Sequence, residues 1–195
     1  MSVIGLTGGI GSGKSRVAAC WRRHFPVDHI DADAVCRDLL QPGAVAWLAL
    51  RQTLDPRFFL ATGELDRQAL RRAIFADAHL RRQVEGLMHP LALTEIQRRL
   101  ATPRHPLVLV EVPLLYEAGW QDFFARVVLV YAEPRVRAKR IVLRDRLTPE
   151  EAQQALAAQP PLEDKIFRAD HVLDNGGCWS WTLLQLFHLG KILAG

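Results

Sequence analysis

Cysteine, lysine and long apolar runs are scarce in this sequence, and each scarcity bears on the class of protein to expect. The three cysteines, Cys20, Cys36 and Cys178, are odd in number and lack the paired spacing of a zinc site, which predicts reduced thiols in a cytoplasmic protein. The longest apolar runs fall short of the roughly 18 residues that a membrane span requires. A secretory leader is not expected either, because a glycine-rich motif follows Met1 closely.

The chain is basic, but its positive charge comes mostly from arginine. Lysine and arginine total 25 against 21 acidic residues, the net charge is +4, and only four of the cationic residues are lysines. Arginine forks suit discrete phosphate or carboxylate groups better than diffuse contact with a polynucleotide. A small polyphosphate ligand therefore explains the charge as well as a nucleic acid does. With 49% hydrophobic residues, the 195-residue chain is expected to fold as one domain with a sizeable core.

The glycine-rich motif near the start of the chain predicts a phosphate-binding loop. Residues 8–15 read G-G-I-G-S-G-K-S, follow an apolar run and precede a helical pattern, which is the context that the pattern G-x-x-x-x-G-K-[ST] requires. Lys14 can reach the β- and γ-phosphates of a nucleotide, and the Ser15 hydroxyl can bind Mg²⁺. The alternative is a flexible glycine turn ahead of a surface helix. The predicted nucleotide-binding residues are Gly9, Gly11, Ser12, Gly13, Lys14, Ser15 and Arg16.

Five short apolar runs predict a parallel sheet that is covered on both faces. They are residues 3–7, 27–30, 107–112, 127–131 and 171–173, and helical patterns separate them. The expected fold is α/β, with a phosphate-loop kinase core around a five-stranded parallel sheet, a helical substrate-binding insertion and a helical lid.

The long gaps between predicted strands suggest how one domain is subdivided. We expect a core of residues 1–34, 105–132 and 169–195, an acceptor lobe of residues 35–104 and a lid of residues 133–168. In the lid, one helix is expected from Pro134 and a second after Thr148, which resembles an N-cap with Glu151 three residues later. Pro90 is expected to break a helix in the acceptor lobe, and the five tryptophans are expected in the core.

Acidic residues follow two of the predicted strands. Asp31-Ala32-Asp33 ends the second strand, and alternation would put Asp31 and Asp33 on one side, with Asp33 projecting farther into the crevice. A carboxylate there would accept a proton from an attacking hydroxyl or hold Mg²⁺ through water. Its alternative role is a helix N-cap for Ala34 onward. Glu111 ends the third strand and would contact the water shell of the metal or bind neighbouring loop amides.

Three arginines share a face of the expected lid helix. Arg137, Arg140 and Arg144 stand at i, i+3 and i+7, where like charges repel one another unless an anion arrives. Arginines so placed would stabilise charge on a transferring phosphoryl group. The alternative is a solvated basic face, for which Glu133 and Asp145 offer partners.

These motifs together resemble the dephospho-coenzyme A kinases. The similarity runs in order over nearly the whole chain, and the late segment A-D-x-V-x-x-N-x-G makes it more specific than the phosphate loop alone. The residues that carry it are 5–15, 31–33, 63–67, 89–90, 112–117, Arg140, Arg144, Asp145, Gln159 and 169–176.

The resemblance implies ATP-dependent phosphorylation of the ribose 3′-hydroxyl of dephospho-coenzyme A, with Mg²⁺, in the final step of coenzyme A synthesis. It implies that Asp33 is the base, that Lys14 and Ser15 hold phosphate and metal, and that Arg140 closes from the lid. Donor binding would also use Arg144 and Asn175, the latter near the adenine, and acceptor binding would use Asp33, Arg37, His89 and Leu115. A cytoplasmic monomer or small homo-oligomer without nucleic-acid or membrane partners is expected.

Two departures from the family pattern concern the metal and the lid. The family often has Asp where this chain has Glu111, and an arginine where it has Ala155, so the lid would depend more on Arg140 and Arg144. Two other functions remain open. A nucleoside monophosphate kinase shares the core and lid but phosphorylates an anion, which needs no base, and a non-catalytic nucleotide switch or nucleic-acid binder would also suit the basic charge.

Overall fold

The computed structural model describes residues 1–194, which pack as two units. Unit 1 comprises Met1–Asp31 and Pro103–Gly195, and unit 2 comprises Ala32–Thr102. Within the described residues, every helix is too short or too polar to cross a membrane.

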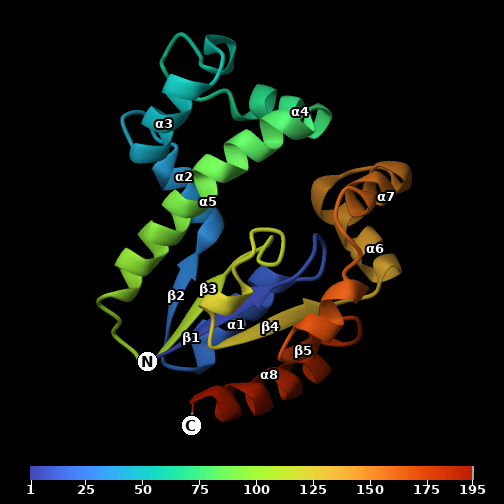
Figure 1. Cartoon of the computed structure of the whole chain (residues 1–195). Helices are drawn as coiled ribbons and strands as arrows, with labels where there is room; N and C mark the ends of the chain where they lie inside the picture. The colour runs from blue at the N-terminus through green and yellow to red at the C-terminus, as the bar shows by residue number, and fades with distance from the viewer. Residues whose placement is uncertain (195) are drawn as a thin grey trace. The chain divides into compact units, whose positions relative to one another are not determined.

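Unit 1 is built on a five-stranded parallel sheet, visible as arrows in Figure 1. The strand order is β2-β3-β1-β4-β5, so the first strand lies in the middle of the sheet. Each of the five apolar runs forms a strand with bounds within a residue of those expected, which confirms the predicted sheet. The strands are β1 Ser2–Thr7, β2 Val27–Asp31, β3 Leu107–Glu111, β4 Arg126–Tyr131 and β5 His171–Asp174.

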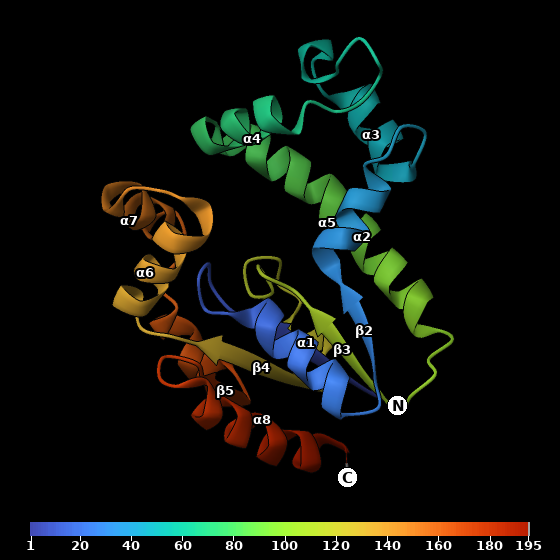
Figure 2. The ribbon, with the colours of Figure 1, turned by 180° about the vertical axis from the view of Figure 1, so that it is seen from behind.

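The core of unit 1 lies between the sheet and two helices, α1 (Lys14–His24) and α8 (Trp179–Ala194). Figure 2 shows α1 running along the sheet. Trp21 of α1 is completely buried in this core, together with side chains of β1, β3 and β4. On the sheet's other face, side chains from the segment between β3 and β4 approach Gly5, where a Cβ would come within 2.7 Å of Leu115. These contacts fix the central strands and the loop that follows β1.

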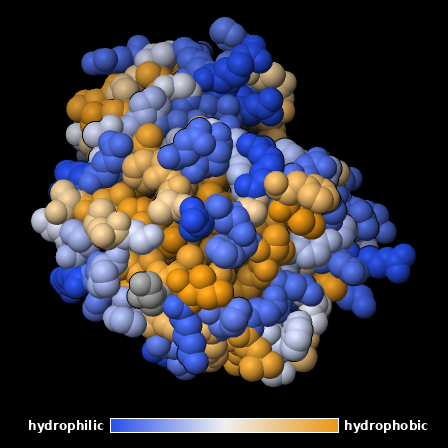
Figure 3. Space-filling view, turned by 60° about the horizontal axis from the view of Figure 1, so that its bottom comes forward, coloured by the Kyte–Doolittle hydropathy of each residue, from blue (hydrophilic) through white to orange (hydrophobic). Residues whose placement is uncertain are grey.

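Helix α8 leaves apolar side chains on the surface, contrary to the expectation that all tryptophans lie in the core. Trp181 is 57% exposed, and Leu184 and Ile192 of the same helix are also more than half exposed. Figure 3, which turns the end of the chain toward the viewer, shows hydrophobic residues gathered on this face. The tryptophans lack a periodic pattern, so the sequence contains no signal that separates Trp181 from the buried Trp21.

Two helices and a 3₁₀ helix connect β4 to β5. They are α6 Pro134–Asp145, α7 Pro149–Ala157 and η3 Glu163–Arg168. Thr148 caps α7: its side chain accepts a hydrogen bond from the Glu151 N–H, while the Glu151 side chain accepts one from the Thr148 N–H. This reciprocal pair is the predicted capping box, and it determines where the second helix of the segment begins.

Unit 2 is helical, as the pattern of its sequence predicts, apart from one isolated β-bridge. Its longest helix passes through Pro90 without ending, so the expected break is wrong. The apolar face of that helix, including Val84, Met88 and Ile96, is buried, and this burial offsets the roughly 3 kcal/mol that an internal proline costs. The elements are α2 Ala32–Leu39, α3 Val45–Thr53, η1 Pro56–Phe58, α4 Arg67–Ala76 and α5 Ala78–Leu100.

Asp33 does not belong to a strand. β2 ends at Asp31, and α2 begins at Ala32, so Asp33 lies in the first turn of a helix. The strand alternation expected to align Asp31 with Asp33 therefore does not apply, and the N-cap alternative is wrong because the helix has already begun. A carboxylate in the first turn of a helix interacts favourably with the helix dipole, which explains why an acidic residue suits this position.

Candidate active site

The phosphate loop connects the central strand β1 to helix α1, the order that its sequence predicts. Gly13 is the N-cap of α1 and has a φ of 87°, a left-handed conformation that glycine adopts without a steric penalty. Its carbonyl accepts hydrogen bonds from the N–H groups of Arg16 and Val17, which starts the helix. A Cβ at Gly13 would collide with the side-chain amide of Asn175. Glycine is therefore required here by both backbone and packing.

Glu111 ties together the two loop residues whose chemistry matters most. Its Oε1 lies 2.6 Å from Lys14 Nζ and 2.7 Å from Ser15 Oγ. Parallel pairing brings it there, since Leu6 of β1 is in register with Glu111 of β3. The alternative expectation was that Glu111 binds loop amides, whereas its hydrogen bonds go to side chains. A contact with the water shell of a metal stays a prediction.

The second oxygen of Glu111 contacts His29, a residue that the sequence reasoning missed. His29 Nε2 lies 3.2 Å from Glu111 Oε2. Burial by itself raises the pKa of the Glu111 carboxyl, but the hydrogen bonds from His29 and Lys14 outweigh it and hold the pKa at about 2. The signal was available in the alternation of β2, because His29 and Asp31 face the same side of that strand.

Asn175 connects the end of β5 to the phosphate loop. Its Nδ2 donates to the Ser12 carbonyl at 2.7 Å, and its Oδ1 accepts from Thr182 Oγ1 at 3.1 Å. Arg140 donates to the Asn175 carbonyl at 2.7 Å. Asn175 is 3% exposed, so this network is shielded from water and its hydrogen bonds are worth more than surface ones. A contact with adenine stays a prediction.

Of the two lid arginines that the family resemblance assigned to the donor site, the structure brings Arg140 to the phosphate loop but not Arg144. Arg140 Nη1 lies 3.3 Å from the carbonyl oxygens of Gly11 and Ser12. Arg144 instead forms two hydrogen bonds of 2.8 Å with its neighbour Asp145, and its side chain is 62% exposed. The guanidinium of Arg16 stacks over the Trp179 ring at 3.8 Å. Their roles in nucleotide binding stay predictions.

Two further residues meet the phosphate loop: Arg137, which the sequence grouped with the other two lid arginines, and Gln159. Arg137 of α6 is buried, and its Nη1 would lie 2.7 Å from a Cβ placed on Gly9. Gln159 Oε1 accepts the N–H of Ile10 at 2.9 Å. The spacing of Arg137 and Arg140 on one helix face was the signal for the first residue. For Gln159, the only signal was its place in the family resemblance.

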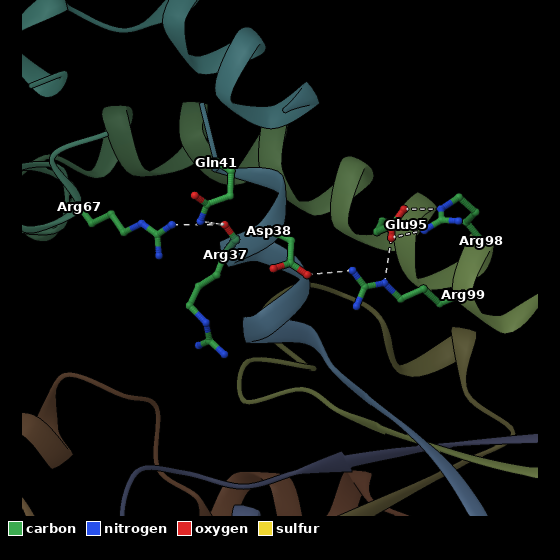
Figure 4. Close-up of polar contacts among 7 residues, drawn as sticks. All are labelled: Arg37, Asp38, Gln41, Arg67, Glu95, Arg98 and Arg99. Atoms are coloured by element: carbon green, nitrogen blue, oxygen red, sulfur yellow. Dashed lines mark hydrogen bonds and ion pairs between the residues drawn. The ribbon is translucent and has the colours of Figure 1, made fainter. Parts of the chain in front are cut away.

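The predicted acceptor residues of unit 2 are placed on two of its helices. Asp33 and Arg37 are both exposed on α2, and the Arg37 carbonyl accepts hydrogen bonds from the side chains of Gln41 and Arg67 (Figure 4). His89 on α5 is half-buried, and burial lowers its pKa while Glu85 opposes that shift. Their roles as base and acceptor contacts stay predictions.

Leu115, the remaining predicted acceptor contact, follows β3 in unit 1. Its side chain is completely buried beside Gly5. Its carbonyl accepts the N–H of Trp120 at 3.0 Å. An acceptor contact through the Leu115 side chain would require a rearrangement of this segment, and it too stays a prediction.

Comparison with known proteins shows the family to which the chain belongs. A family model described as dephospho-CoA kinase matches residues 2–180. A curated dephospho-CoA kinase from Anaeromyxobacter dehalogenans is 44% identical over 181 residues, which cover 91% of this chain and 85% of that protein. The crystal structure of TT1252 from Thermus thermophilus is 34% identical and covers all of this chain and 98% of its own, with a TM-score of 0.82. A dephospho-CoA kinase from Campylobacter jejuni, at 21% identity, shares the fold with a TM-score of 0.69 over 98% and 96% of the two chains.

Proposed function

Because the chain belongs to the dephospho-coenzyme A kinase family, we propose that Lys14, Asp33 and Arg140 carry out its phosphoryl transfer. The reaction is ATP-dependent phosphorylation of the ribose 3′-hydroxyl of dephospho-coenzyme A, which gives coenzyme A and ADP in the last step of coenzyme A synthesis. The match of the family model to residues 2–180 carries this conclusion, because that span includes the complete phosphate loop.

ATP is the phosphoryl donor, and its phosphates would bind in the loop. The N-terminus of α1 adds partial positive charge there, and the Lys14 ammonium would contact the β- and γ-phosphates. Arg140, already bonded to loop carbonyls, would stabilise charge on the transferring group. The further donor contacts that we propose are Gly9, Gly11, Ser12, Gly13, Ser15, Arg16, Arg144 and Asn175, the last beside the adenine.

Asp33 is proposed as the base that activates the acceptor. The proton of the ribose 3′-hydroxyl passes to the Asp33 carboxylate, and the hydroxyl oxygen forms a bond to the γ-phosphorus. The bond from that phosphorus to the β–γ bridging oxygen breaks, so ADP leaves with its electron pair. The exposed position of Asp33 at the start of α2 supports this role, since a base must reach its substrate.

The side chains around Ser15 suit Mg²⁺, which we propose as the metal of the reaction. The Ser15 hydroxyl and a Glu111 carboxylate oxygen lie 2.7 Å apart, and Mg²⁺ prefers such hard oxygen atoms together with water and phosphate. Ser15 would bind the ion directly and Glu111 would reach it through water. When bound, Mg²⁺ neutralises charge on the β- and γ-phosphates.

The remaining parts of the chain would divide acceptor binding and closure between them. We propose residues 35–104 as the acceptor lobe, with Arg37 and His89 contacting dephospho-coenzyme A together with Leu115. Residues 133–168 would be the lid on a core of residues 1–34, 105–132 and 169–195. The separate packing of Ala32–Thr102 supports the lobe, and the contacts of α6 with the loop support the lid.

One kinetic comparison tests the function. ADP release from ATP and Mg²⁺ is measured by coupled assay with dephospho-coenzyme A, with AMP, and with single-stranded DNA or RNA as the added component. Rapid turnover with dephospho-coenzyme A alone is expected. Preferential turnover of AMP would point to a nucleoside monophosphate kinase, and hydrolysis stimulated only by nucleic acid would point to a nucleotide switch.

A cytoplasmic location and a monomeric or small homo-oligomeric state are also proposed. The thiols of Cys20, Cys36 and Cys178 support the location, because reducing compartments preserve thiols. Size-exclusion chromatography with light scattering at several protein concentrations would measure the oligomeric state.

A further inference from the structure

Arg137 is a buried cation with an unused hydrogen-bond donor. It lies on α6 with 4% of its surface exposed, and its Nε is buried and has no hydrogen-bond partner among residues 1–194. Arg135, two residues earlier on the same helix, is exposed. Burying a charge is unfavourable unless hydrogen bonds or an opposite charge compensate it. A buried arginine that is only partly compensated points to a ligand as its partner.

The guanidinium of Arg137 lies against the phosphate loop itself. Its Nη1 occupies the space beside Gly9, 2.7 Å from where a Cβ would be, so a larger residue at position 9 would displace the end of the Arg137 side chain. The backbone of Arg137 is equally close to the next glycine, with its carbonyl 2.8 Å from a Cβ placed on Gly11. α6 therefore packs directly on residues 9–11, the outer part of the loop.

A neutral group, the side-chain amide of Gln159, accepts the hydrogen bond of the loop N–H beside this arginine. The Ile10 N–H donates to Gln159 Oε1 at 2.9 Å, and that oxygen lies 3.3 Å from the position of a Cβ on Gly9. Amides of a phosphate loop bind phosphate oxygens when a nucleotide is present. The Gln159 oxygen thus occupies the Ile10 N–H, a donor that an anion would use. This N–H lies next to the Arg137 cation, which lacks an anionic partner within hydrogen-bond distance among the residues that the structure describes.

The protein supplies little negative charge to Arg137. Burial lowers the pKa of its guanidinium, and the negative charge of Glu163 only partly opposes that effect. Within the described part of the chain, the two side chains form no ion pair within 4.0 Å, and Glu163 instead accepts a hydrogen bond from Tyr131. The electrostatic environment therefore favours an incoming anion.

We propose that Arg137 is a further phosphate-binding residue, which contacts the terminal phosphoryl group of the donor nucleotide when Gln159 gives up the Ile10 amide. The inference rests on the proposed function, because it requires ATP in the loop. Arg140 has a different task in this arrangement, since it already donates to the carbonyls of Gly11, Ser12 and Asn175.

Nucleotide binding to the full chain tests the proposal. Affinities for ADP and for the non-hydrolysable β,γ-imido analogue of ATP are measured by calorimetry with Mg²⁺ for wild type, Arg137→Met and the exposed control Arg135→Met. Arg137→Met is expected to weaken binding of the analogue by about tenfold or more and binding of ADP by less than about threefold. The reason is that only the analogue has a γ-phosphoryl group, whose contact with Arg137 would be lost. Arg135→Met should leave both affinities within about twofold of wild type. Arg137→Lys should recover part of the loss, because it keeps the charge but not the fork.

Thermal unfolding without nucleotide separates this role from a structural one. Arg137→Met replaces a buried charge by an apolar chain of similar length, so an unchanged or higher Tm is expected. Equal weakening of ADP and the analogue, or no weakening of the analogue, would overturn the proposal. Wild-type turnover of dephospho-coenzyme A is measured in parallel. Its absence would refute the proposed function, whereas the analogue-to-ADP ratio tests Arg137 independently of the acceptor.

Discussion

The two units differ in where their charged side chains lie. Within residues 1–194, every buried polar or charged residue belongs to unit 1, and among them are Glu111, Arg137, Lys165 and Asn175. The buried residues described in unit 2 are apolar. Holding a polyphosphate requires fixed charges and donors out of water, whereas the core of a helical lobe can be built from apolar side chains alone.

Two arginines at the end of α5 in unit 2 form ion pairs near the surface instead. Arg98 and Arg99 both donate to Glu95, and Arg99 also reaches Asp38 at 3.0 Å, which links α5 to α2 (Figure 4). Exposed ion pairs of this kind contribute little to stability, because water and salt screen them. The comparison therefore predicts that equal changes of charge have very unequal effects in the two units.

Removal of the loop lysine should have the largest effect. Lys14→Ala is expected to lower kcat/KM by about 10³-fold, roughly 4 kcal/mol, because the γ-phosphate loses a charged contact in the transition state. Steady-state kinetics with varied ATP would measure it. Lys139→Ala removes an exposed lysine and serves as the control. Similar losses in both variants would break the contrast between buried and exposed charges.

Asp33→Asn tests whether unit 2 contributes chemistry despite its apolar core. We expect kcat to fall by about 10²-fold or more, about 3 kcal/mol in the barrier, with ATP affinity nearly unchanged, because asparagine cannot accept the hydroxyl proton. Asp38→Asn, on the same helix, should keep most of the activity. A loss confined to KM would show that Asp33 only positions the substrate.

Glu111→Gln should lower the free energy of unfolding more than the same change at a surface glutamate does. Lys14 would lose its ionic partner in a buried site, which is expected to cost about 1–3 kcal/mol of unfolding free energy. Urea denaturation at neutral pH, compared with the exposed control Glu150→Gln, measures this cost. A Glu111→Gln effect no larger than the control would mean that the cluster is already well hydrated.

The surface pairs of unit 2 should give the smallest effect, and it should depend on pH. Hydrogen bonds from Arg98 and Arg99 lower the pKa of Glu95 to about 2. Because this pKa is lowered on folding, the carboxylate stabilises the protein above its ordinary pKa and loses that contribution as the pH falls toward 2. Glu95→Gln should cost about 1 kcal/mol or less at pH 7 and nearly nothing near pH 2.

Denaturation across this pH range would check the prediction, with the exposed Glu64→Gln as a control that changes little at any pH. A Glu95→Gln effect that persists at the lowest pH would show that packing, rather than charge, is responsible.

Local patterns predicted the fold well where residues close together in sequence determine the structure. The apolar runs became strands, and Thr148 with Glu151 became a capping box. Local reasoning failed where distant contacts decide, since the burial of one face carries α5 through Pro90. Local reasoning also failed at Asp33, because the sequence contains no signal for the residue at which β2 ends and α2 begins.

The amino-acid sequence by itself identified the family, because the motifs of the resemblance occur in order along the chain. It also located the phosphate loop and the parallel sheet, because these depend on glycine spacing and on short apolar runs. Only the tertiary structure decided that Glu111 joins Lys14 to Ser15 and that Arg137 is buried against Gly9. Strand register and helix packing bring these residues together across about a hundred positions of sequence or more. Such contacts depend on the summed packing of the whole unit, which no local pattern encodes.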